Sequence, residues 1–600
     1  MEKDRKTLRQ VYDRRILKRM LLFAKPYWYL FALALILIFA VTGASLARPY
    51  LTKIGIDKYI AGNLKGTLSS QEASRGIWYL GAFFLGLIIV EFAFGYLQRY
   101  ILELTGKKVI MDIRQKVFEH IQHLPLSYFD KQAAGRVVTR ITNDPETINE
   151  MFSSVLVGFI KSIVEMIAII VVMFKLSYRL TLVSFTVLPL IILAAVLFRK
   201  KAREMWERIR AKLSQINAFL AEHIAGMKII QIFNMQGKKY EEFDHINSEF
   251  YDAHRRRVII FGIFRPFMDV VQSLAMALLL WYGGRNILSG FLEFGTLYMF
   301  VDYIGRFYHP IMELTEQFNA LQSSLVSAER VFNLLDEEQE PNIEGKLQKF
   351  DEIDGEIEFK NVWFAYIDEN WVLKDISFKI KPGESAAFVG ATGAGKTSII
   401  NLLCGFYEPQ RGQILVDGID IRDIGKEKLR KNIGLVLQDV SLFSGELATN
   451  IRLFEPGISM KEVKEAAKHV NAHDFIKKLY GGYAHEVSEG GSTLSVGQRQ
   501  LISFARALIR DPKILVMDEA TSHVDTETET LIQDALINLM KGRTTIAIAH
   551  RLSTIQNVDK IIVIHRGRIR EMGDHQKLLN NRGLYYNLYR LQYDQEYKVV

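Results

Sequence analysis

The sequence predicts an all-α membrane domain with six spans, followed by an α/β domain built around a phosphate-binding loop. Three observations support this division. Apolar stretches of about twenty residues, the length at which a helix crosses a bilayer, recur between residues 26 and 316. From residue 355 onward, short β-type runs alternate with turns, and a glycine-rich loop lies between one such run and a helix-like segment. At 600 residues, the chain is also too long for a single core.

The N-terminal half begins with a basic segment and continues with the apolar spans. Eight of the first 20 residues are Lys or Arg, and Leu17, Met20 and Leu21 follow at helical spacing. We therefore expect residues 1–25 to form an amphipathic elbow helix on the cytoplasmic membrane surface, without a cleaved signal peptide. The transmembrane domain is expected over 26–320, with spans at residues 26–47, 76–98, 153–175, 180–198, 258–282 and 294–316.

The loops between the spans differ in length and charge. Segments 99–152 and 199–257 are long and rich in Lys and Arg, whereas the other connections are shorter and less basic. Because basic loops stay in the cytoplasm, both termini, both long loops and the C-terminal half are predicted to be cytoplasmic in a multi-pass protein of the inner (cytoplasmic) membrane. The net charge of +9 is then a topology signal, and no nucleic-acid partner is expected. Each long loop contains a probable helix break, at 124–130 and at 222–227.

Several ionisable residues fall inside the predicted spans, where an unpaired charge is costly. They are Glu91, Lys161 with Glu165, Arg265 with Asp269, and Asp302 with Arg306. The members of each of these three pairs are four residues apart, so each pair can neutralise itself on one helix face. Three interpretations remain open: a polar substrate pathway, ion pairs between helices, or positions nearer the membrane interface than the predicted bounds place them. The spans are also rich in aromatic residues, which suit either an apolar substrate cavity or the membrane interface.

A linker is expected over residues 321–354, since a helical run is followed there by the acidic stretch 336–340. The nucleotide-binding domain is expected over 355–600. The one cysteine, Cys404, excludes a disulfide within the chain, and no Cys/His spacing indicates zinc.

The phosphate-binding loop fits the pattern G-x-x-x-x-G-K-[ST] and lies between a strand-like run, 385–389, and a helix-like run that starts at Ser398. In that context, backbone N–H groups and the helix N-terminus bind phosphate oxygens. Lys396 is expected to reach the β- and γ-phosphates of ATP, and the Thr397 hydroxyl to ligate Mg²⁺. The predicted nucleotide-binding residues here are Gly390, Ala391, Thr392, Gly393, Ala394, Gly395, Lys396, Thr397 and Ser398.

A second apolar strand, 513–517, ends in the carboxylates Asp518 and Glu519. Ligands bind at the carboxyl ends of strands in α/β sheets. We therefore expect Asp518 to hold Mg²⁺ through water and Glu519 to polarise the attacking water. A third apolar strand, 544–549, ends in His550, which is placed to sense the γ-phosphate.

Residues 494–500, LSVGQRQ, resemble the LSGGQ signature of ATP-binding-cassette (ABC) ATPases. Other motifs follow the family order: an aromatic A-loop residue at Tyr366, a Q-loop glutamine at Gln438, an X-loop-like stretch at 486–490, and a D-loop ending in Asp525. Six spans followed by one such domain resemble a half-transporter of the ABC exporter type.

The resemblance implies a dimer in which each ATP lies between the phosphate loop of one chain and the signature of the other. Tyr366 would stack on adenine, Gln438 would contact Mg²⁺ and the attacking water, and Asp525 would lie in the D-loop at the interface. Ser495, Gly497 and Gln498 would contact the partner's ATP. The helix breaks near 125 and 225 would be coupling helices that dock on the ATPase domains. The cargo would be a hydrophobic or amphipathic drug, lipid or peptide, exported by alternating access.

Three motifs depart from the family pattern. Val496 occupies the position where the signature usually has glycine, and His523 occupies the position where the D-loop usually has a small residue. In the X-loop, Ser488 and Gly490 occupy positions where a glycine and a charged residue are common. Val496 is expected to restrict the backbone and to crowd the γ-phosphate. Because these positions serve the partner's ATP, the pattern favours a heterodimer with a related half-transporter over a homodimer.

Other functions compete with this interpretation. The membrane spans count against a soluble P-loop enzyme. An ATP-gated channel or a regulatory subunit could share the architecture, although no feature of the sequence demands a continuous pore. About 25 residues precede the first span, which leaves no room for a protease domain, and the order of the domains is that of an exporter rather than an importer.

Overall fold

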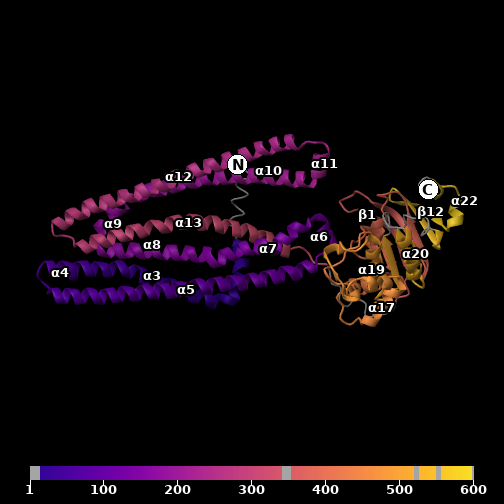
Figure 1. Cartoon of the computed structure of the whole chain (residues 1–600), viewed down its shortest axis with the longest axis horizontal. Coiled ribbons are helices and arrows are strands. Elements are labelled where there is room, and N and C mark those ends of the chain that lie inside the picture. The colour runs from indigo at the N-terminus through magenta and orange to yellow at the C-terminus, as the bar shows by residue number, and fades with distance from the viewer. Residues whose placement is uncertain (1–13, 341–352, 519–525, 549–555, 597–600) are drawn as a thin grey trace. The chain divides into compact units, whose positions relative to one another are not determined.

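The computed structural model describes residues 14–340, 353–518, 526–548 and 556–596. The chain forms two compact units (Figure 1). The helical unit comprises Met1–Gln122 and Ala133–Glu337, and the second unit comprises His123–Gln132 and Glu338–Val600. The short segment 123–132 thus groups with the second unit, although both of its neighbours in sequence belong to the helical unit.

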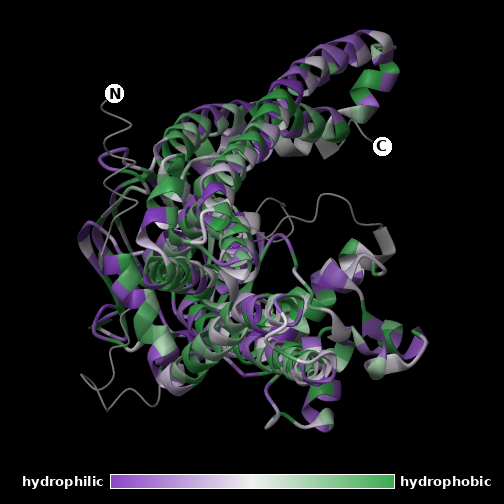
Figure 2. Ribbon diagram, turned by 90° about the vertical axis from the view of Figure 1, so that its left-hand side faces the viewer, coloured by the Kyte–Doolittle hydropathy of each residue, from purple (hydrophilic) through white to green (hydrophobic). Residues whose placement is uncertain are grey.

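The helical unit consists of long helices joined by short connections. Its elements are α2 (Arg14–Ala24), α3 (Trp28–Ile54), α4 (Ala61–Leu64), α5 (Ser70–Gln122), α7 (Ala134–Glu150), α8 (Leu156–Leu176), α9 (Tyr178–Phe185), α10 (Leu188–Ala225), α11 (Met227–Ile232), α12 (Gln236–Leu288) and α13 (Phe294–Leu335). Single turns of π-helix connect α3 to α4 (Gly55–Ile60) and α7 to α8 (Met151–Val155). Figure 2 shows hydrophobic residues along much of these helices.

Within the described ranges, five helical stretches are long and apolar enough to cross a membrane. They are Arg15–Leu64, Ser70–Gln122, Ala134–Leu176, Tyr178–Ala225 and Gln236–Leu288. They contain the first five predicted spans, which are thereby confirmed as helices of membrane-spanning length and composition.

The sixth predicted span lies in α13, which is helical throughout but is not among those five stretches. Asp302 and Arg306 lower its hydropathy. Its surroundings explain how this composition is tolerated, because α13 packs against α3, α7, α8 and α12. Phe300, Tyr303 and Phe307 are buried in those contacts, so much of this helix faces protein rather than lipid.

Some ionisable residues in and beside the predicted spans form ion pairs. Arg48 on α3 and Glu91 on α5 are 3.2 Å apart. Arg306 on α13 binds Asp302 at 2.7 Å and donates to the Ser45 hydroxyl on α3, also at 2.7 Å. Arg48 and Glu91 thus pair between helices, whereas Asp302 and Arg306 pair along one helix, and the contact with Ser45 joins that helix to α3. For these residues the structure supports the interpretation as paired charges.

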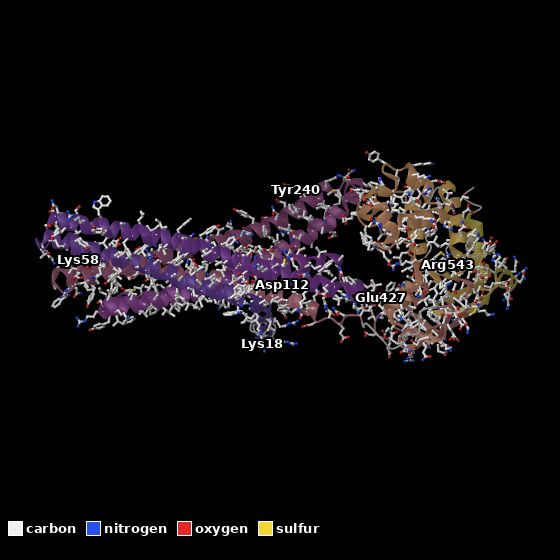
Figure 3. The ribbon with its side chains drawn as sticks, turned by 90° about the horizontal axis from the view of Figure 1, so that it is seen from below. Lys18, Lys58, Asp112, Tyr240, Glu427 and Arg543 are labelled. Carbon is white, nitrogen blue, oxygen red and sulfur yellow. The ribbon has the colours of Figure 1, made fainter. Side chains whose placement is uncertain are left out.

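The amphipathic segment is confirmed as a helix over the part that the structure describes. In α2, Phe23 stacks on Phe332 of α13 with ring centroids 6.1 Å apart, and Arg19 binds Asp336 at 2.6 Å. Tyr27, just after α2, donates to Asp112 of α5 at 2.9 Å. Figure 3 shows Lys18 and Asp112 toward one end of the helical unit and Lys58 at the other.

Both predicted helix breaks are present. The first separates α5 from α7 and contains α6 (Leu126–Lys131), which begins directly after Pro125, a residue with extended backbone. Proline disfavours helical conformation in the residue before it, so α5 ends there. The second break separates α10 from α12 and contains α11. Ile229 and Ile232 of α11 are exposed, and so is Phe233 directly after it.

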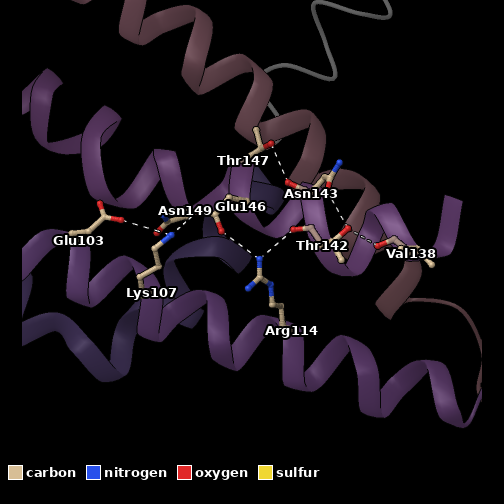
Figure 4. A network of polar contacts seen from close by, with 9 residues as sticks. All are labelled: Glu103, Lys107, Arg114, Val138, Thr142, Asn143, Glu146, Thr147 and Asn149. Atoms are coloured by element: carbon tan, nitrogen blue, oxygen red, sulfur yellow. Dashed lines mark hydrogen bonds and ion pairs between the residues drawn. The ribbon is translucent and has the colours of Figure 1, made fainter. Parts of the chain in front are cut away.

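The two helices that flank α6 are joined by a polar network (Figure 4). Glu146 of α7 binds Lys107 at 2.6 Å and Arg114 at 3.3 Å, both on α5. Arg114 also donates to the Thr142 carbonyl at 3.3 Å. These contacts hold α5 and α7 side by side at the base of the break.

The second unit contains a largely parallel sheet in the part that the structure describes, with the strand order β12-β11-β3-β10-β9-β6. Its strands are β3 (Ser385–Val389), β6 (Ile433–Val436), β9 (Ile514–Asp518), β10 (Thr544–Ile548), β11 (Lys560–His565) and the antiparallel β12 (Arg568–Gly573). A second, antiparallel sheet has the strand order β2-β1-β4-β5. Its strands are β1 (Ile357–Phe364), β2 (Leu373–Ile380), β4 (Arg411–Val416) and β5 (Ile419–Asp420).

Helices surround this parallel sheet, and an α/β fold is thereby confirmed for the second unit. The helices are α14 (Lys396–Leu403), α15 (Lys426–Lys431), α16 (Leu447–Arg452), α17 (Met460–His469), α18 (His473–Lys478), α19 (Val496–Leu508), α20 (Thr526–Met540), α22 (His575–Asn580) and α23 (Leu584–Glu596). Two short strands, β7 (Gly445–Glu446) and β8 (Glu486–Val487), pair with each other. One apolar core joins the two larger sheets, and a second lies under α16, α17, α19 and α20.

Candidate nucleotide site

The phosphate loop follows β3 in the middle of the parallel sheet and leads into α14. Two of its glycines are required by the surrounding atoms. A Cβ at Gly390 would lie 2.2 Å from the Ile564 carbonyl oxygen, and one at Gly395 would lie 2.6 Å from Leu373 Cδ2. Gly395 also has φ = 104°, a left-handed conformation that side chains disfavour. Only glycine therefore lets the loop turn this tightly against its neighbours.

Lys396 is held inside the loop. Its Nζ donates to the carbonyl oxygens of Gly390 at 2.8 Å and Ala391 at 3.2 Å. The side chain is buried, and this burial lowers the pKa of Lys396 even though Asp518 opposes the shift. A desolvated ammonium group inside a glycine-rich phosphate loop is well suited to bind a phosphate. Of the other predicted loop residues, Ala391, Thr392 and Gly393 are exposed and Ala394 is buried.

The two predicted magnesium ligands meet across the sheet. The Thr397 hydroxyl, at the start of α14, donates to Asp518 Oδ2 at 3.2 Å, and Asp518 is the last residue of β9. Mg²⁺ takes few protein ligands and keeps several waters. One hydroxyl and one carboxylate beside a phosphate loop therefore fit this ion.

The adenine-side residue Tyr366 follows β1. Its hydroxyl lies 3.1 Å from the Ser398 hydroxyl and accepts from the Asn401 amide at 3.1 Å, and both partners are on α14. Its ring is partly exposed and meets Phe364 and Tyr407 edge-on. Two bonds to one helix thus fix a ring that keeps accessible surface.

Gln438 is less closely placed. It is exposed, two residues beyond the end of β6. That strand pairs with β9, where Val436 is opposite Met517. Gln438 therefore lies at the same sheet edge as Asp518.

The signature forms the N-terminus of α19 with a capping box. The Gln498 N–H donates to the Ser495 hydroxyl at 3.2 Å, and the Gln498 side chain accepts from the Ser495 N–H at 3.0 Å. The S-x-x-Q spacing in the sequence favours this cap. Gly497 is buried in the first turn.

Val496 is the first residue of α19 and has a negative φ. An α-helical residue needs no glycine, so the backbone conformation itself does not explain why glycine is usual here. The expected effect of valine on backbone freedom and on the partner's γ-phosphate stays a prediction for Val496. Its side chain is 45% exposed, so valine adds apolar volume on the surface. By contrast, Gly490 has φ = 68°, which accounts for a glycine in the X-loop.

Three predicted site residues, Glu519, Asp525 and His550, lie outside the described residues. The strands that lead to two of them are described. Asp518 at the end of β9 pairs with Ile548 at the end of β10, and Ile548 also pairs with Phe388 of β3. The chain therefore leaves β3, β9 and β10 at one edge of the sheet.

Comparison with known proteins identifies the family. Two family models match the chain: one described as the ABC transporter transmembrane region over residues 31–311, and one described as ABC transporter over residues 373–522. A putative ABC transporter ATP-binding protein, exp8, of Streptococcus pneumoniae is 42% identical over 96% of this chain and 97% of its own length. The chain belongs to the ABC transporter family.

Other similar proteins agree with this assignment. The probable multidrug resistance ABC transporter ATP-binding/permease protein YheH of Bacillus subtilis is 42% identical over 88% of this chain and 79% of its own length. The solved structure of a bacterial Atm1-family ABC exporter with ATP bound has a TM-score of 0.77 and 27% identity, and the match covers 97% of this chain and 99% of the other. This ABC exporter is a multi-pass membrane protein that fuses its transmembrane region to an ATPase domain and couples ATP hydrolysis to export.

Sequence reasoning missed two residues beside the nucleotide site. Asn401 binds the Tyr366 hydroxyl, and Tyr407 packs against the Tyr366 ring. A signal for the first was available, because Ser398 and Asn401 are three residues apart and share one helix face. Tyr407 is 41 positions from Tyr366 in the sequence and has no such local signal.

The Thr397–Asp518 contact predicts how hydrolysis depends on magnesium. Thr397→Val keeps the shape of the side chain but removes the hydroxyl, so we expect ATPase activity at 1 mM Mg²⁺, roughly the usual assay level, to fall at least about tenfold. Thr397→Ser keeps the hydroxyl and is expected to stay within about threefold of the wild type. ATPase activity measured across a magnesium titration checks both variants. Equal activity of Thr397→Val and Thr397→Ser would contradict the role of the Thr397 hydroxyl as a magnesium ligand.

Proposed function

We propose that this chain is one subunit of a dimeric exporter that binds two ATP molecules with Mg²⁺ between two ATPase domains. The observation that carries the proposal is the arrangement where β3 and β9 end: Lys396 is held inside the phosphate loop, and Thr397 bonds to Asp518. In this proposal Lys396 holds the β- and γ-phosphates, Thr397 and Asp518 hold Mg²⁺, and Tyr366 stacks on adenine. Glu519 would polarise the attacking water, Gln438 would contact that water and Mg²⁺, and His550 would sense the γ-phosphate.

The need for a second chain rests on the signature. The capped end of α19 presents backbone donors and the exposed Val496 side chain, features that suit contact with a nucleotide on another subunit. Ser495, Gly497 and Gln498 are the proposed contacts, together with Asp525 of the D-loop. The apolar surface beside α11 is a second region that suits a partner's ATPase domain.

ATP would drive transport by differential affinity. If both nucleotides bind more tightly when the two ATPase domains are closed, their binding shifts the population toward an outward-facing membrane domain. Hydrolysis and release then restore the inward-facing state. The basic long loops support a cytoplasmic location for the ATPase domains and both termini, in the cell membrane.

The proposed cargo is amphipathic: a drug, a lipid or a hydrophobic peptide. Among the apolar helices, Ser162 of α8 donates to Glu313 of α13 at 3.1 Å, and His309 lies 3.4 Å from the same carboxylate. Glu165 interacts electrostatically with both His309 and Glu313. A molecule with both an apolar body and a polar group suits helices that combine these side chains with exposed aromatic rings. The name of the Bacillus relative, a probable multidrug resistance transporter, is in line with this class.

This cargo class predicts the pattern of ATPase stimulation. Amphipathic amines and phospholipids are expected to raise the ATPase rate of the reconstituted transporter, whereas small hydrophilic solutes are expected to leave it unchanged. The rate is measured in nanodiscs against a panel of both classes. Stimulation by sugars or inorganic ions instead would count against an amphipathic cargo.

The catalytic proposal predicts a separation of binding from turnover. Glu519→Gln removes the group that polarises water but leaves the phosphate loop intact, so ATP affinity is expected to stay within about threefold while turnover falls at least about a hundredfold. Binding is measured with a fluorescent ATP analogue and turnover by phosphate release. Near-normal turnover of this variant would show that another residue is the base.

We further propose that the partner is a related half-transporter rather than a second copy. The support is the branched, exposed side chain of Val496 on the surface proposed to contact the partner's ATP, together with the unusual His523. Apolar volume there crowds a phosphate without affecting the site at Lys396. The two ATP sites of the assembly would then differ in their rate of hydrolysis.

The heterodimer proposal predicts the behaviour of the chain alone. Purified without a partner, it is expected to show little ATPase activity, and Val496→Gly is expected to raise that activity severalfold by restoring a small signature residue. The substitution Ile537→Gly, at another exposed apolar position on a helix of the same unit, serves as the control. A stable homodimer with robust, substrate-stimulated activity and no response to Val496→Gly would exclude the proposal.

A further inference from the structure

The segment that separates α5 from α7, which contains α6, is hydrogen-bonded to the loop that follows α14. The Tyr407 hydroxyl donates to Asp130 Oδ2 in α6. Burial, and then the bond to Asp130, raise the pKa of Tyr407 well above its usual range. The hydroxyl therefore stays protonated and keeps donating at physiological pH.

A second bond holds the other end of the same segment. The Glu340 N–H donates to the His123 carbonyl at 2.8 Å, and the Glu340 carboxylate accepts two bonds from Arg430, at 2.7 and 2.9 Å. Arg430 also donates to the carbonyl oxygens of Cys404 and Gly405, both at 3.2 Å. Segment 123–132 is thus bonded directly to Tyr407 at Asp130, and it is linked at His123 through Glu340 and Arg430 to the carbonyls of residues 404 and 405, which directly follow α14.

Tyr407 also touches the proposed adenine platform. Its ring meets the Tyr366 ring edge-on, with centroids 5.0 Å apart and planes at 87°, and it meets Phe364 with centroids 5.6 Å apart. Tyr366 is itself tied to α14 through Ser398 and Asn401. One aromatic side chain therefore contacts the base platform with its ring and α6 with its hydroxyl.

We propose that Tyr407 is a positioning residue that communicates occupancy of the base site at Tyr366 to α6. This inference rests on the proposed stacking of adenine on Tyr366. A stacked base restricts the orientation of the Tyr366 ring, and edge-to-face packing depends on orientation. The restricted Tyr366 ring favours the Tyr407 rotamer that bonds Asp130, and α6 is then held more firmly against the loop.

The coupling acts in both directions. If base binding stabilises the Tyr407–Asp130 bond, then this bond must stabilise bound nucleotide by the same factor. One hydrogen bond supports an effect of about fivefold. The phosphates alone would not produce it, because Lys396 and Thr397 contact neither Tyr407 nor Asp130 in the bonds that place them.

The test is hydrogen exchange at α6 in the full-length protein reconstituted in nanodiscs. Exchange of the amides of residues 126–131 is compared with and without a saturating, non-hydrolysable imido analogue of ATP. The wild type is expected to exchange about fivefold more slowly with nucleotide. Tyr407→Phe, which removes the hydroxyl and keeps the ring, is expected to reduce this protection to less than about twofold, with nucleotide affinity changed by no more than about fivefold.

Two further variants keep the test decisive. Asp130→Ala breaks the same bond from α6 and is expected to lose the same protection. Tyr480→Phe removes a hydroxyl from a fully exposed tyrosine of the same unit and is expected to match the wild type. Unchanged protection in both Tyr407→Phe and Asp130→Ala would overturn the proposal.

Failure of the underlying assumption gives a different result. If adenine does not stack on Tyr366, then Tyr366→Ala binds the ATP analogue as tightly as the wild type. If stacking holds but the proposed coupling does not, Tyr366→Ala weakens binding while Tyr407→Phe keeps full protection of α6. The two outcomes are read from separate measurements, affinity and exchange.

Discussion

The parallel pairing of β3, β10 and β9 determines where the phosphate loop and Asp518 lie. Ile548 pairs with both Phe388 and Asp518, so the three strands end at the same level. The phosphate loop leaves from one strand and the acidic residue ends another, which brings Thr397 and Asp518 within 3.2 Å across the sheet. A shift of one residue in this register would turn Asp518 toward the other face of the sheet. The chemistry therefore depends on backbone hydrogen bonds well away from the nucleotide.

The features that the sequence predicts well are those with a local physical cause. The phosphate loop follows from its glycines and its lysine, the spans follow from uninterrupted apolar length, and the break at α6 follows from Pro125. In each case, a short stretch contains both the pattern and the reason for the structure. The sequence also indicates that charged residues inside the membrane form pairs, because an unpaired charge there is costly.

The features that the sequence does not predict depend on contacts between distant residues. Tyr407 meets Asp130 across 277 positions, and Glu340 meets Arg430 across 90. Nothing near any of these residues in the sequence identifies its partner. Val496 is a different case, because the sequence shows its departure from the family motif, and the structure adds that the residue begins a capped helix with a negative φ and an exposed side chain.

The bonds from Lys396 to its own loop have a consequence for the energetics of the nucleotide. Before phosphate arrives, the ammonium group already has two acceptors, the carbonyl oxygens of Gly390 and Ala391. Binding is then an exchange of partners for this charge, so the affinity gained is smaller than the full strength of the lysine–phosphate contact. The same carbonyls accept the ammonium again when phosphate departs. A loop that supplies a resting partner for its lysine lowers the cost of product release, which a transporter must repeat in every cycle.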